Sequence, residues 1–410
     1  MRLAAPPGSL PAFVAAVVLT GPTQAPPSPA RFTAHTIDSG LSGGYQVVVA
    51  DLNRDGKPDI IALASGLNEL RWYENPGWTP HVLVTGINQP INAAAYDVDG
   101  DGIPEIALAH GFSNVYARSL GIVSILTHQG DPAGLWSIRE IDRVPTSHRL
   151  WFADIDGTGK KVLINSPLIG PRAIAPDYRD RVALLMYRPG EWKRELISDT
   201  EEGVVHGLLP TAWDDPKRQS LLSASFLGVH ALKFDKGQWT RTLVVKGDPA
   251  DWPKSGSSDV IVGHLGRERF VATIEPWHGN KVVIYRQDRD TWKRHVIDEA
   301  IADGHTIVAG DFDGDGQDEL IVGERQGRRS VYLYRVTNAG DDIWSKEPVD
   351  DGGMAGAGCA VADLNADKRP DVVCIGTATA NLKWYENRSV VSGAVIRLQA
   401  RVSPVPHAPE

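Results

Sequence analysis

Short stretches of alternating apolar and polar residues fill the chain, and none of them keeps a helical period for long. Alternation of this kind between turn residues predicts β-strands. The strands recur in groups of four about every 50 residues. A repeat of this length and content is typical of a propeller blade, so we predict an all-β chain folded as a β-propeller.

An apolar strand that runs into an Asp-rich turn is the first marker of the repeat. Five copies read VVVADLNRDGKPDIIAL, AAAYDVDGDGIPEIAL, LWFADIDGTGKKVLI, VAGDFDGDGQDELIV and AVADLNADKRPDVVCI. The interval from Asp154 to Asp311 has room for two more copies, and two eroded ones begin at Leu208 and Val260. The marker therefore predicts seven blades of four strands.

A tryptophan that opens a short strand is the second marker, at intervals of 47 to 58 residues. The tryptophans concerned are Trp78, Trp136, Trp192, Trp239, Trp292 and Trp344. The seventh unit lacks such a strand, whereas an unmatched FTAHTID segment precedes the first unit. We expect this N-terminal strand to complete the last blade and close the ring, because closure leaves no exposed edge.

The first 30 residues are typical of an export signal. Arg2 supplies a positive charge, Leu10 begins a short apolar stretch, and small residues follow. The stretch is too short to span a bilayer comfortably, and no later one does so. We predict a leader over 1–30, a propeller over 31–388 and an unassigned tail over 389–410, in a secreted or periplasmic protein. A disordered Pro/Ala-rich leader is the alternative.

Net charge bears on the partners of the protein, and cysteine content bears on a possible disulfide. The chain has 42 Lys and Arg against 51 Asp and Glu, and its net charge of -9 argues against nucleic acid as the main partner. The two cysteines, Cys359 and Cys374, are expected almost opposite each other on neighbouring strands of the last unit. Export would permit a disulfide between them, and two buried thiols are the alternative.

Four of the Asp-rich turns carry acid or amide side chains at positions 1, 3, 5 and 9. These residues are Asp51, Asn53, Asp55 and Asp59; Asp97, Asp99, Asp101 and Glu105; Asp311, Asp313, Asp315 and Glu319; and Asp363, Asn365, Asp367 and Asp371. Calcium takes six to eight oxygen ligands, and a tight turn aims alternate side chains at one point. We expect about four structural calcium ions. Turns that merely favour Asp and Gly are the alternative.

These repeats resemble those of the FG-GAP or VCBS propellers, the integrin-α-like family, over nearly all of the chain after its leader. The resemblance implies calcium binding at the turn between the first and second strands of a blade. The Phe-Gly…Gly-Ala-Pro element of the family is not preserved, and its nearest remnant is Gly356-Ala357-Gly358. Partner recognition is the family's commonest role. It implies, as one alternative, a non-catalytic adhesion module that binds a cell-surface protein.

The face opposite the calcium loops is rich in candidate functional residues. Three units place His148, His206 and His305 at the start of their first strand, with Arg149 beside the first of them. Further ligand-binding candidates on this face are Gln46, Asn92, His110, Asp259, Glu275, Trp277, His278 and Glu324. Three interpretations stay open: a catalytic general-base set, a transition-metal site, and imidazoles that cap strands or line a water-filled channel.

The WYENPG segment and strands such as WKRHVID resemble those of secreted sugar-active propellers of the aldos-2-ulose dehydratase type. This resemblance implies a carbohydrate or other small-molecule ligand and a lyase or dehydratase reaction on a keto-sugar. The candidate bases or metal ligands are then His148, His206 and His305. Arg149 would stabilise the negative charge that develops, and Trp277 would stack on a sugar ring.

Overall fold

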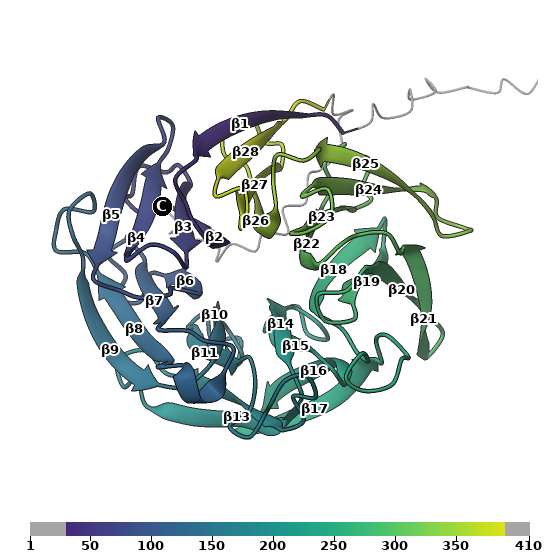
Figure 1. Cartoon of the computed structure of the whole chain (residues 1–410), viewed down its shortest axis with the longest axis horizontal. Helices are drawn as coiled ribbons and strands as arrows, with labels where there is room; N and C mark the ends of the chain where they lie inside the picture. Colours follow the sequence, from purple (N-terminus) through teal and green to yellow (C-terminus); the bar gives the residue numbers. More distant parts are fainter. Residues whose placement is uncertain (1–29, 390–410) are drawn as a thin grey trace, which may run out of the picture.

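The computed structural model describes residues 30–389 and contains seven four-stranded antiparallel sheets. The sheets stand around a central axis as the blades of a propeller (Figure 1). The all-β class and the seven blades are therefore confirmed. The expected leader lies outside the described residues except for Ala30, and so does the C-terminal tail from residue 390.

In blades 1 to 6 the four strands follow chain order from the axis outward. Blade 7 has the same order for its three inner strands, and the N-terminal strand β1 is its outer strand (Figure 1). Blade 1 contains β2 (Gly44–Ala50), β3 (Asp59–Ala64), β4 (Glu69–Glu74) and β5 (Thr79–Thr85). Blade 2 contains β6 (Asn92–Tyr96), β7 (Glu105–His110), β8 (Ile122–Thr127) and β9 (Ser137–Arg143). Blade 3 contains β10 (Ser147–Ala153), β11 (Val162–Pro167), β12 (Arg181–Tyr187) and β13 (Arg194–Glu202).

The remaining blades follow the same order. Blade 4 contains β14 (Val205–Thr211), β15 (Ser220–Ser225), β16 (Gly228–Asp235) and β17 (Gln238–Val245). Blade 5 contains β18 (Asp259–Leu265), β19 (Glu268–Glu275), β20 (Lys281–Asp288) and β21 (Thr291–Asp298). Blade 6 contains β22 (Gly304–Gly310), β23 (Glu319–Glu324), β24 (Val331–Asn338) and β25 (Ile343–Asp350). Blade 7 contains β26 (Gly356–Ala362), β27 (Asp371–Gly376), β28 (Leu382–Asn387) and β1 (Phe32–Asp38).

The ring closes as the sequence predicts. Strand β1 pairs antiparallel with β28, and Phe32 lies opposite Asn387. In the same blade Cys359 of β26 lies opposite Cys374 of β27, and the two form a disulfide with a Cα–Cα distance of 4.2 Å. The structure thus contains the disulfide that the sequence left as one of two alternatives. The bridge ties the two inner strands of the closing blade together.

Apolar side chains fill the space between neighbouring blades. One cluster combines Val48 and Ile61 of blade 1 with Ala93 and Ile106 of blade 2, all of them buried. Burial of such side chains on both faces of a sheet stabilises the ring at about 25 cal/mol per Å² of apolar surface. Each blade covers the apolar face of its neighbour. A single blade could therefore not bury its apolar side chains without the rest of the ring.

Polar contacts also join neighbouring blades. At four boundaries a tyrosine on the third strand of a blade donates a hydrogen bond to an aspartate at the end of the preceding blade's outer strand. The pairs are Tyr73 with Asp38, Tyr187 with Asp142, Tyr334 with Asp298 and Tyr385 with Asp350, at 2.5 to 2.8 Å. An Arg or Lys contacts each of these aspartates, so each carboxylate is paired.

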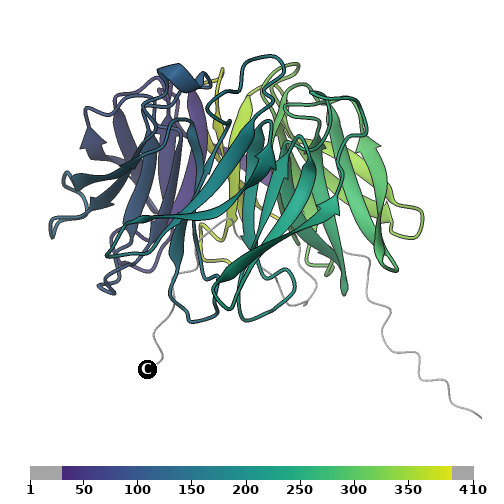
Figure 2. The same ribbon diagram turned by 90° about the horizontal axis from the view of Figure 1, so that it is seen from below.

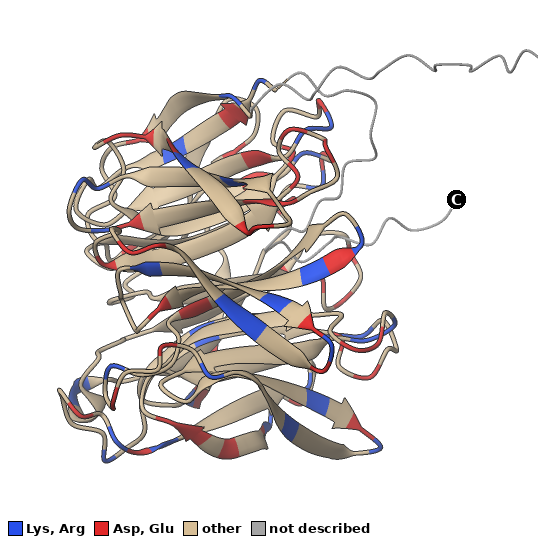
Figure 3. Ribbon diagram, turned by 90° about the vertical axis from the view of Figure 1, so that its right-hand side faces the viewer, with Lys and Arg blue, Asp and Glu red and all other residues tan. Residues whose placement is uncertain are grey.

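The surface carries charges of both signs, which are spread over the ribbon in Figure 3. None of the helices in residues 30–389 has the length and apolar character needed to cross a membrane. The part of the chain that the structure describes contains a single short 3-10 helix, η1 (Tyr116–Arg118), in the loop between β7 and β8.

Candidate functional site: a histidine cluster at the channel mouth

Long loops between the second and third strands of blades 2 and 3 rise on one face of the ring, together with η1 (Figure 2, top). A small pocket lies at the ring axis and is partly open to solvent. First strands from several blades supply the lining, which includes Tyr45, Gln46, Asn92, Arg149 and His305. The start of these strands therefore brings polar side chains to the axis, as the sequence predicts.

Four imidazoles meet at this face. His206 lies in the middle, and its ring centroid is 5.0 Å from that of His148, 4.8 Å from that of His305 and 4.9 Å from that of His278. His148, His206 and His305 belong to β10, β14 and β22, whereas His278 stands in the loop after β19. The three residues predicted as a catalytic or metal-binding set are thus brought together, and His278 joins them.

Backbone carbonyls fix the orientation of two of these rings. Nδ1 of His206 donates to the carbonyl oxygen of Ser258, and Nδ1 of His305 donates to that of Ala357. A carbonyl oxygen only accepts, so both rings carry their proton on Nδ1 and present a lone pair on Nε2. Nε2 of His305 is buried and has no hydrogen-bond partner among the described residues.

The cluster is held in the neutral form. Burial is the main cause that lowers the pKa of His148, His206 and His305 well below 6.5, and the charge of Arg149 acts in the same direction on each of them. Burial, with the charges of Arg325 and Arg149, lowers the pKa of His278 to about 3. At neutral pH all four rings are therefore uncharged, and each has one ring nitrogen without a proton.

Three of the rings lie close enough together to share a metal ion. Each of His206, His278 and His305 can offer one ring nitrogen, and these atoms lie within 4.8 Å of one another. Three neutral histidines with Nδ1 held by a carbonyl or carboxylate are a common ligand set for zinc. The buried lone pair of His305 supports this assignment, because a buried polar atom without a partner is rare.

Tyr45, which the sequence analysis missed, also belongs to the site and contacts His148. Its hydroxyl group lies 2.6 Å from Nε2 of His148, and Nη1 of Arg149 lies 3.4 Å from the same nitrogen. The Arg149 guanidinium also lies over the Tyr45 ring, 5.7 Å from its centroid. Arg149 only donates, so Nε2 of His148 accepts and Nδ1 carries the proton, which is buried without a partner among residues 30–389.

Two predicted ligand-binding residues join neighbouring blades. Gln46 pairs through its side-chain amide with both backbone groups of Ala93, and Oδ1 of Asn92 accepts from the backbone nitrogen of Leu150 at 2.8 Å. Both still line the channel. Asp259 is buried at the start of β18 and accepts from the backbone nitrogen of Val260.

Three other candidates bond to groups within and beside their own blades. His110 contacts Ser124 Oγ at 3.3 Å. Glu275 accepts from Tyr285 at 2.6 Å and forms an ion pair with Arg294. The oxygen atoms of Glu324 accept from the backbone nitrogens of Ala302 and Arg328 and from the hydroxyl of Tyr332. The sequence suggested ligand contact because these residues stand at the end of the second strand. In the structure the two buried glutamates already accept hydrogen bonds from the donors named above.

Trp277 belongs to an aromatic cluster at the rim of the site. Its ring lies 4.7 Å from His278, 5.4 Å from Tyr178 and 5.9 Å from Phe226, while Trp252 packs on Phe226 at 5.1 Å. The indole nitrogen of Trp277 is buried without a hydrogen-bond partner in the described part of the chain. Loops from three blades build this cluster, so the spacing of aromatic residues along the chain does not reveal it.

The four Asp-rich turns lie on the opposite face, and each has the same pattern of hydrogen bonds. The aspartate at position 1 accepts from the backbone nitrogen of position 6, and the acid at position 9 accepts from that of position 2. These bonds measure 2.8 to 3.0 Å in all four turns. The third unit keeps the first bond, between Asp154 and Gly159, although its last acid is missing.

Carboxylates in these turns lie close together, although some have a basic partner, such as Lys57 for Asp55 and His128 for Asp101. Those of Asp97, Asp99 and Asp101 lie within 4.8 Å of one another, and so do those of Asp311, Asp313 and Asp315. Burial and neighbouring acids raise the pKa of Asp313 to about 6, and burial raises that of Glu319 well above 4.5. Burial also raises the pKa of Asp59 and of Asp371 to about 7. A divalent cation would relieve this repulsion.

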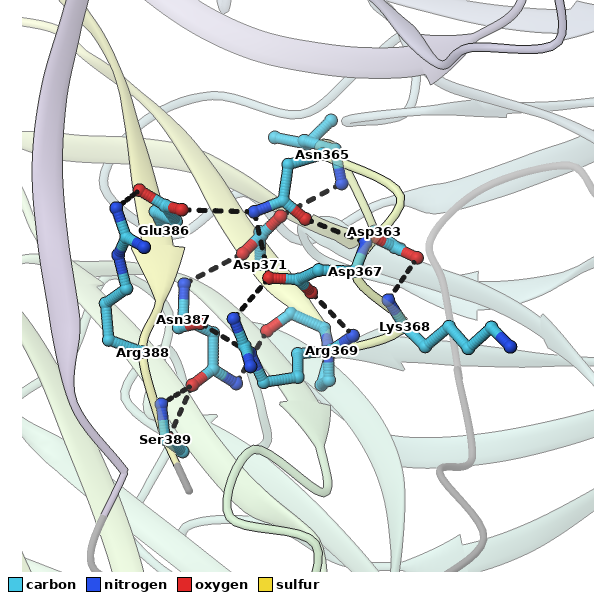
Figure 4. Close-up of polar contacts among 12 residues, drawn as sticks. Asp363, Asn365, Asp367, Lys368, Arg369, Asp371, Glu386, Asn387, Arg388 and Ser389 are labelled. Carbon is cyan, nitrogen blue, oxygen red and sulfur yellow. Dashed lines mark hydrogen bonds and ion pairs between the residues drawn. The ribbon is translucent and has the colours of Figure 1, made fainter. Parts of the chain in front are cut away.

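The turn of blade 7 differs from the others (Figure 4). The Arg369 guanidinium contacts Asp367, while Asn365 bonds to Glu386 of β28 at 3.2 Å. Asn387 joins this turn to that of blade 6, because its side-chain nitrogen donates to the carbonyl oxygens of Pro370 and Phe312. In blade 4, where the acid pattern is eroded, Lys233 binds Asp214 at 2.6 Å.

Comparison with known proteins finds similarity to aldos-2-ulose dehydratase and to FG-GAP-like repeats. Residues 120–288 match the β-propeller domain of aldos-2-ulose dehydratase, and residues 51–108 and 311–374 match the FG-GAP-like repeat. The aldos-2-ulose dehydratase of Phanerodontia chrysosporium is 24% identical over 408 residues, which cover 86% of this chain and 44% of that protein. The chain thus spans under half the length of this relative. It is a propeller with segments that match FG-GAP-like repeats, and it is similar to aldos-2-ulose dehydratase.

Proposed function

We propose that this protein is an exported, calcium-stabilised propeller that binds a keto-sugar at the histidine cluster and eliminates water from it. The observation that carries the proposal is the convergence of neutral imidazoles, Tyr45 and a largely buried Arg149 on one channel mouth. The similarity to a dehydratase of aldos-2-uloses supports the same chemistry. The reaction class is that of a carbon–oxygen lyase.

His206, His278 and His305 would hold a transition metal through their ring nitrogens. A bound divalent ion such as zinc would polarise the carbonyl oxygen of the sugar and make the neighbouring C–H more acidic. The chain's own contribution is to keep the three rings neutral and to align the buried rings of His206 and His305 through the carbonyls of Ser258 and Ala357.

Tyr45 and His148 would move the proton. The phenolic oxygen takes the proton from the carbon next to the carbonyl while its own proton passes to Nε2 of His148, 2.6 Å away. The electrons of the broken C–H bond form a carbon–carbon double bond as the hydroxyl group on the next carbon departs. As its bond to carbon breaks, that group accepts the proton from Nε2 of His148, and it leaves as water. Arg149 over the Tyr45 ring stabilises the negative charge during this transfer.

The acid-rich turns would bind about four calcium ions, and these ions would stiffen the face away from the site. The same-spaced carboxylates with raised pKa values support this role. Calcium and the Cys359–Cys374 disulfide suit the exported location that the leader predicts.

The test is turnover of an aldos-2-ulose, followed by the ultraviolet absorbance of the conjugated product. Wild-type protein should form this product, and the triple variant His148→Ala, His206→Ala, His305→Ala should not. The variant His295→Ala is the control, because this histidine lies on the outer strand β21 and pairs with Asp342.

Two outcomes would contradict the proposal. Equal turnover by the wild type and a folded triple variant would remove the cluster from the chemistry. No turnover of any keto-sugar, with saturable binding of a protein partner at this face, would favour the adhesion module instead.

A further inference from the structure

A guanidinium and a carboxylate compete for one nitrogen of His278. Nη2 of Arg325 lies 2.9 Å from Nδ1 of His278, and Oδ1 of Asp303 lies 3.3 Å from the same atom. Arg325 and Asp303 also form an ion pair with each other, at 2.9 and 3.1 Å. Arg325 follows β23 and Asp303 precedes β22, so both belong to blade 6 whereas His278 belongs to blade 5.

The observed contacts put the His278 ring in a tautomer that does not suit a metal ion. A guanidinium has no acceptor, so Arg325 must donate and Nδ1 of His278 must accept. The neutral ring then carries its proton on Nε2, which lies 3.3 Å from Nε2 of His206. His206 already carries its proton on Nδ1, so it accepts this bond. In this state the lone pair of His278 faces away from the other two rings.

We propose that Asp303 and Arg325 are opposed positioning residues for His278. Arg325 holds the ring in the tautomer that donates to His206, and Asp303 is the acceptor for Nδ1–H in the tautomer that presents Nε2 to a metal ion. This inference rests on the proposed metal at His206, His278 and His305. A carboxylate behind a ligating imidazole orients the ring and raises its basicity, and removal of such a partner typically lowers metal affinity 10- to 100-fold.

The backbone at this point supports a built arrangement. His278 and Asp303 both adopt the left-handed conformation, with φ angles of 50° and 57°. Residues other than glycine rarely adopt it, and such strain persists where surrounding contacts enforce it. Here the backbone nitrogen of His278 donates to Ser258 Oγ, and that of Arg325 donates to the carbonyl oxygen of Asp303. The loops thus hold His278 against the ion pair at a conformational cost.

Opposite effects of two substitutions test the proposal. Purified protein is stripped of metal and titrated with Zn²⁺ against a chromophoric chelator. Asp303→Asn should weaken binding 10- to 100-fold, because the amide offers Nδ1–H a poorer acceptor. Arg325→Met should tighten binding, because it removes both a cation and the donor that blocks Nδ1. Affinities that change in the same direction, or remain unchanged in both variants, would overturn the proposal.

A second ion pair in the same loop provides matched controls. Arg328 binds Asp351 at 2.6 Å, and both side chains are about half exposed or more. Arg328→Met and Asp351→Asn make the same charge changes without contact to the histidines. They should leave zinc affinity within about twofold of wild type, since exposed charges are well screened. Controls that reproduce the two main effects would reduce those effects to long-range charge and would also overturn the proposal.

A metal-free measurement separates this inference from the proposed function. With 15N-labelled histidine, NMR reports which ring nitrogen of His278 carries the proton. Metal-free wild type should show Nε2–H, and Arg325→Met should shift the ring toward Nδ1–H. If the wild type binds no metal but the tautomer shifts, the metal centre is refuted while the hold of Arg325 on the ring stands. An unchanged tautomer in Arg325→Met overturns the inference whatever the metal result.

Discussion

Substitution of the buried Asp313 should change the stability of the protein in opposite directions with and without calcium. Asp313 is 1% exposed and lies beside Asp311 and Asp315 in the turn of blade 6. Burial, with the charge of Asp315, raises its pKa from 3.8 to about 6. A raised folded-state pKa means that the protonated carboxyl stabilises the fold below pH 3.8. This stability is lost as the pH rises through about 6.

The size of the effect follows from this pKa. At pH 7.5 without calcium, the ionised side chain destabilises the fold by at most about 3 kcal/mol, since each pKa unit corresponds to about 1.4 kcal/mol. Asp313→Asn removes the charge but keeps Oδ1, which accepts from the backbone nitrogen of Asp315 at 3.2 Å. The unfolding entropy of a chain of this size, roughly 0.75 kcal/mol per kelvin, converts 3 kcal/mol to about 4 °C in Tm.

The assay is thermal unfolding at pH 7.5 in chelator and in calcium. In chelator the Asp313→Asn variant should melt up to about 4 °C higher than wild type. In calcium it should melt lower, because the turn loses a charged ligand. In chelator, the Tm of the wild type should also fall more than that of the variant between pH 5 and pH 7.5. Asp290→Asn, in the exposed hairpin of blade 5, is the control and should change neither Tm.

Loss of stability in both conditions would refute the electrostatic reasoning, because it would mean that the carboxylate is needed without metal. A gain in both conditions would refute the calcium site in this turn. Only a change of sign between chelator and calcium agrees with a buried acid cluster that a cation neutralises.

Three further predictions concern other parts of the ring. Tyr45→Phe should lower kcat on an aldos-2-ulose by 10²-fold or more with little change in KM, and an unchanged kcat would exclude Tyr45 from proton transfer. Cys374→Ser should lower the free energy of unfolding by about 3 kcal/mol, measured by denaturant titration, because the disulfide closes a 15-residue loop. Asn387→Ala should lower the free energy of unfolding by about 1 to 3 kcal/mol in the same assay, because it leaves the buried carbonyls of Phe312 and Pro370 unpaired. An unchanged free energy would contradict a stabilising role for this link between blades 6 and 7.

The architecture could be predicted from the sequence because its signals are local and repeated. Strand alternation, the Asp-rich turns and the strand-opening tryptophans each recur once per blade, so even the eroded fourth and fifth units were found by spacing. The same count assigned β1 to the last blade, since one unit lacked an outer strand that the N-terminus could supply. It also placed Cys359 opposite Cys374, although only the tertiary structure chose the disulfide over two thiols.

The site was only partly predictable, because the direction of a loop side chain depends on other blades. The sequence placed His148, His206 and His305 at equivalent strand starts, and these do converge. Tyr45 and Asp303 gave no signal, since their importance comes from contacts with His148 and His278 across blade boundaries.

Glu275 and Glu324 stand at the same strand end, where the sequence suggested ligand contact. Their carboxylates serve local donors instead, because buried charges require partners and Arg294, Tyr285 and Tyr332 supply them. The sequence by itself therefore determined the ring, its closure and the spacing of the acidic turns, which follow from periodicity along one chain. Only the tertiary structure decided which of these candidates contact one another across blades and which pair locally, because that choice is made by hydrogen-bond partners from neighbouring blades.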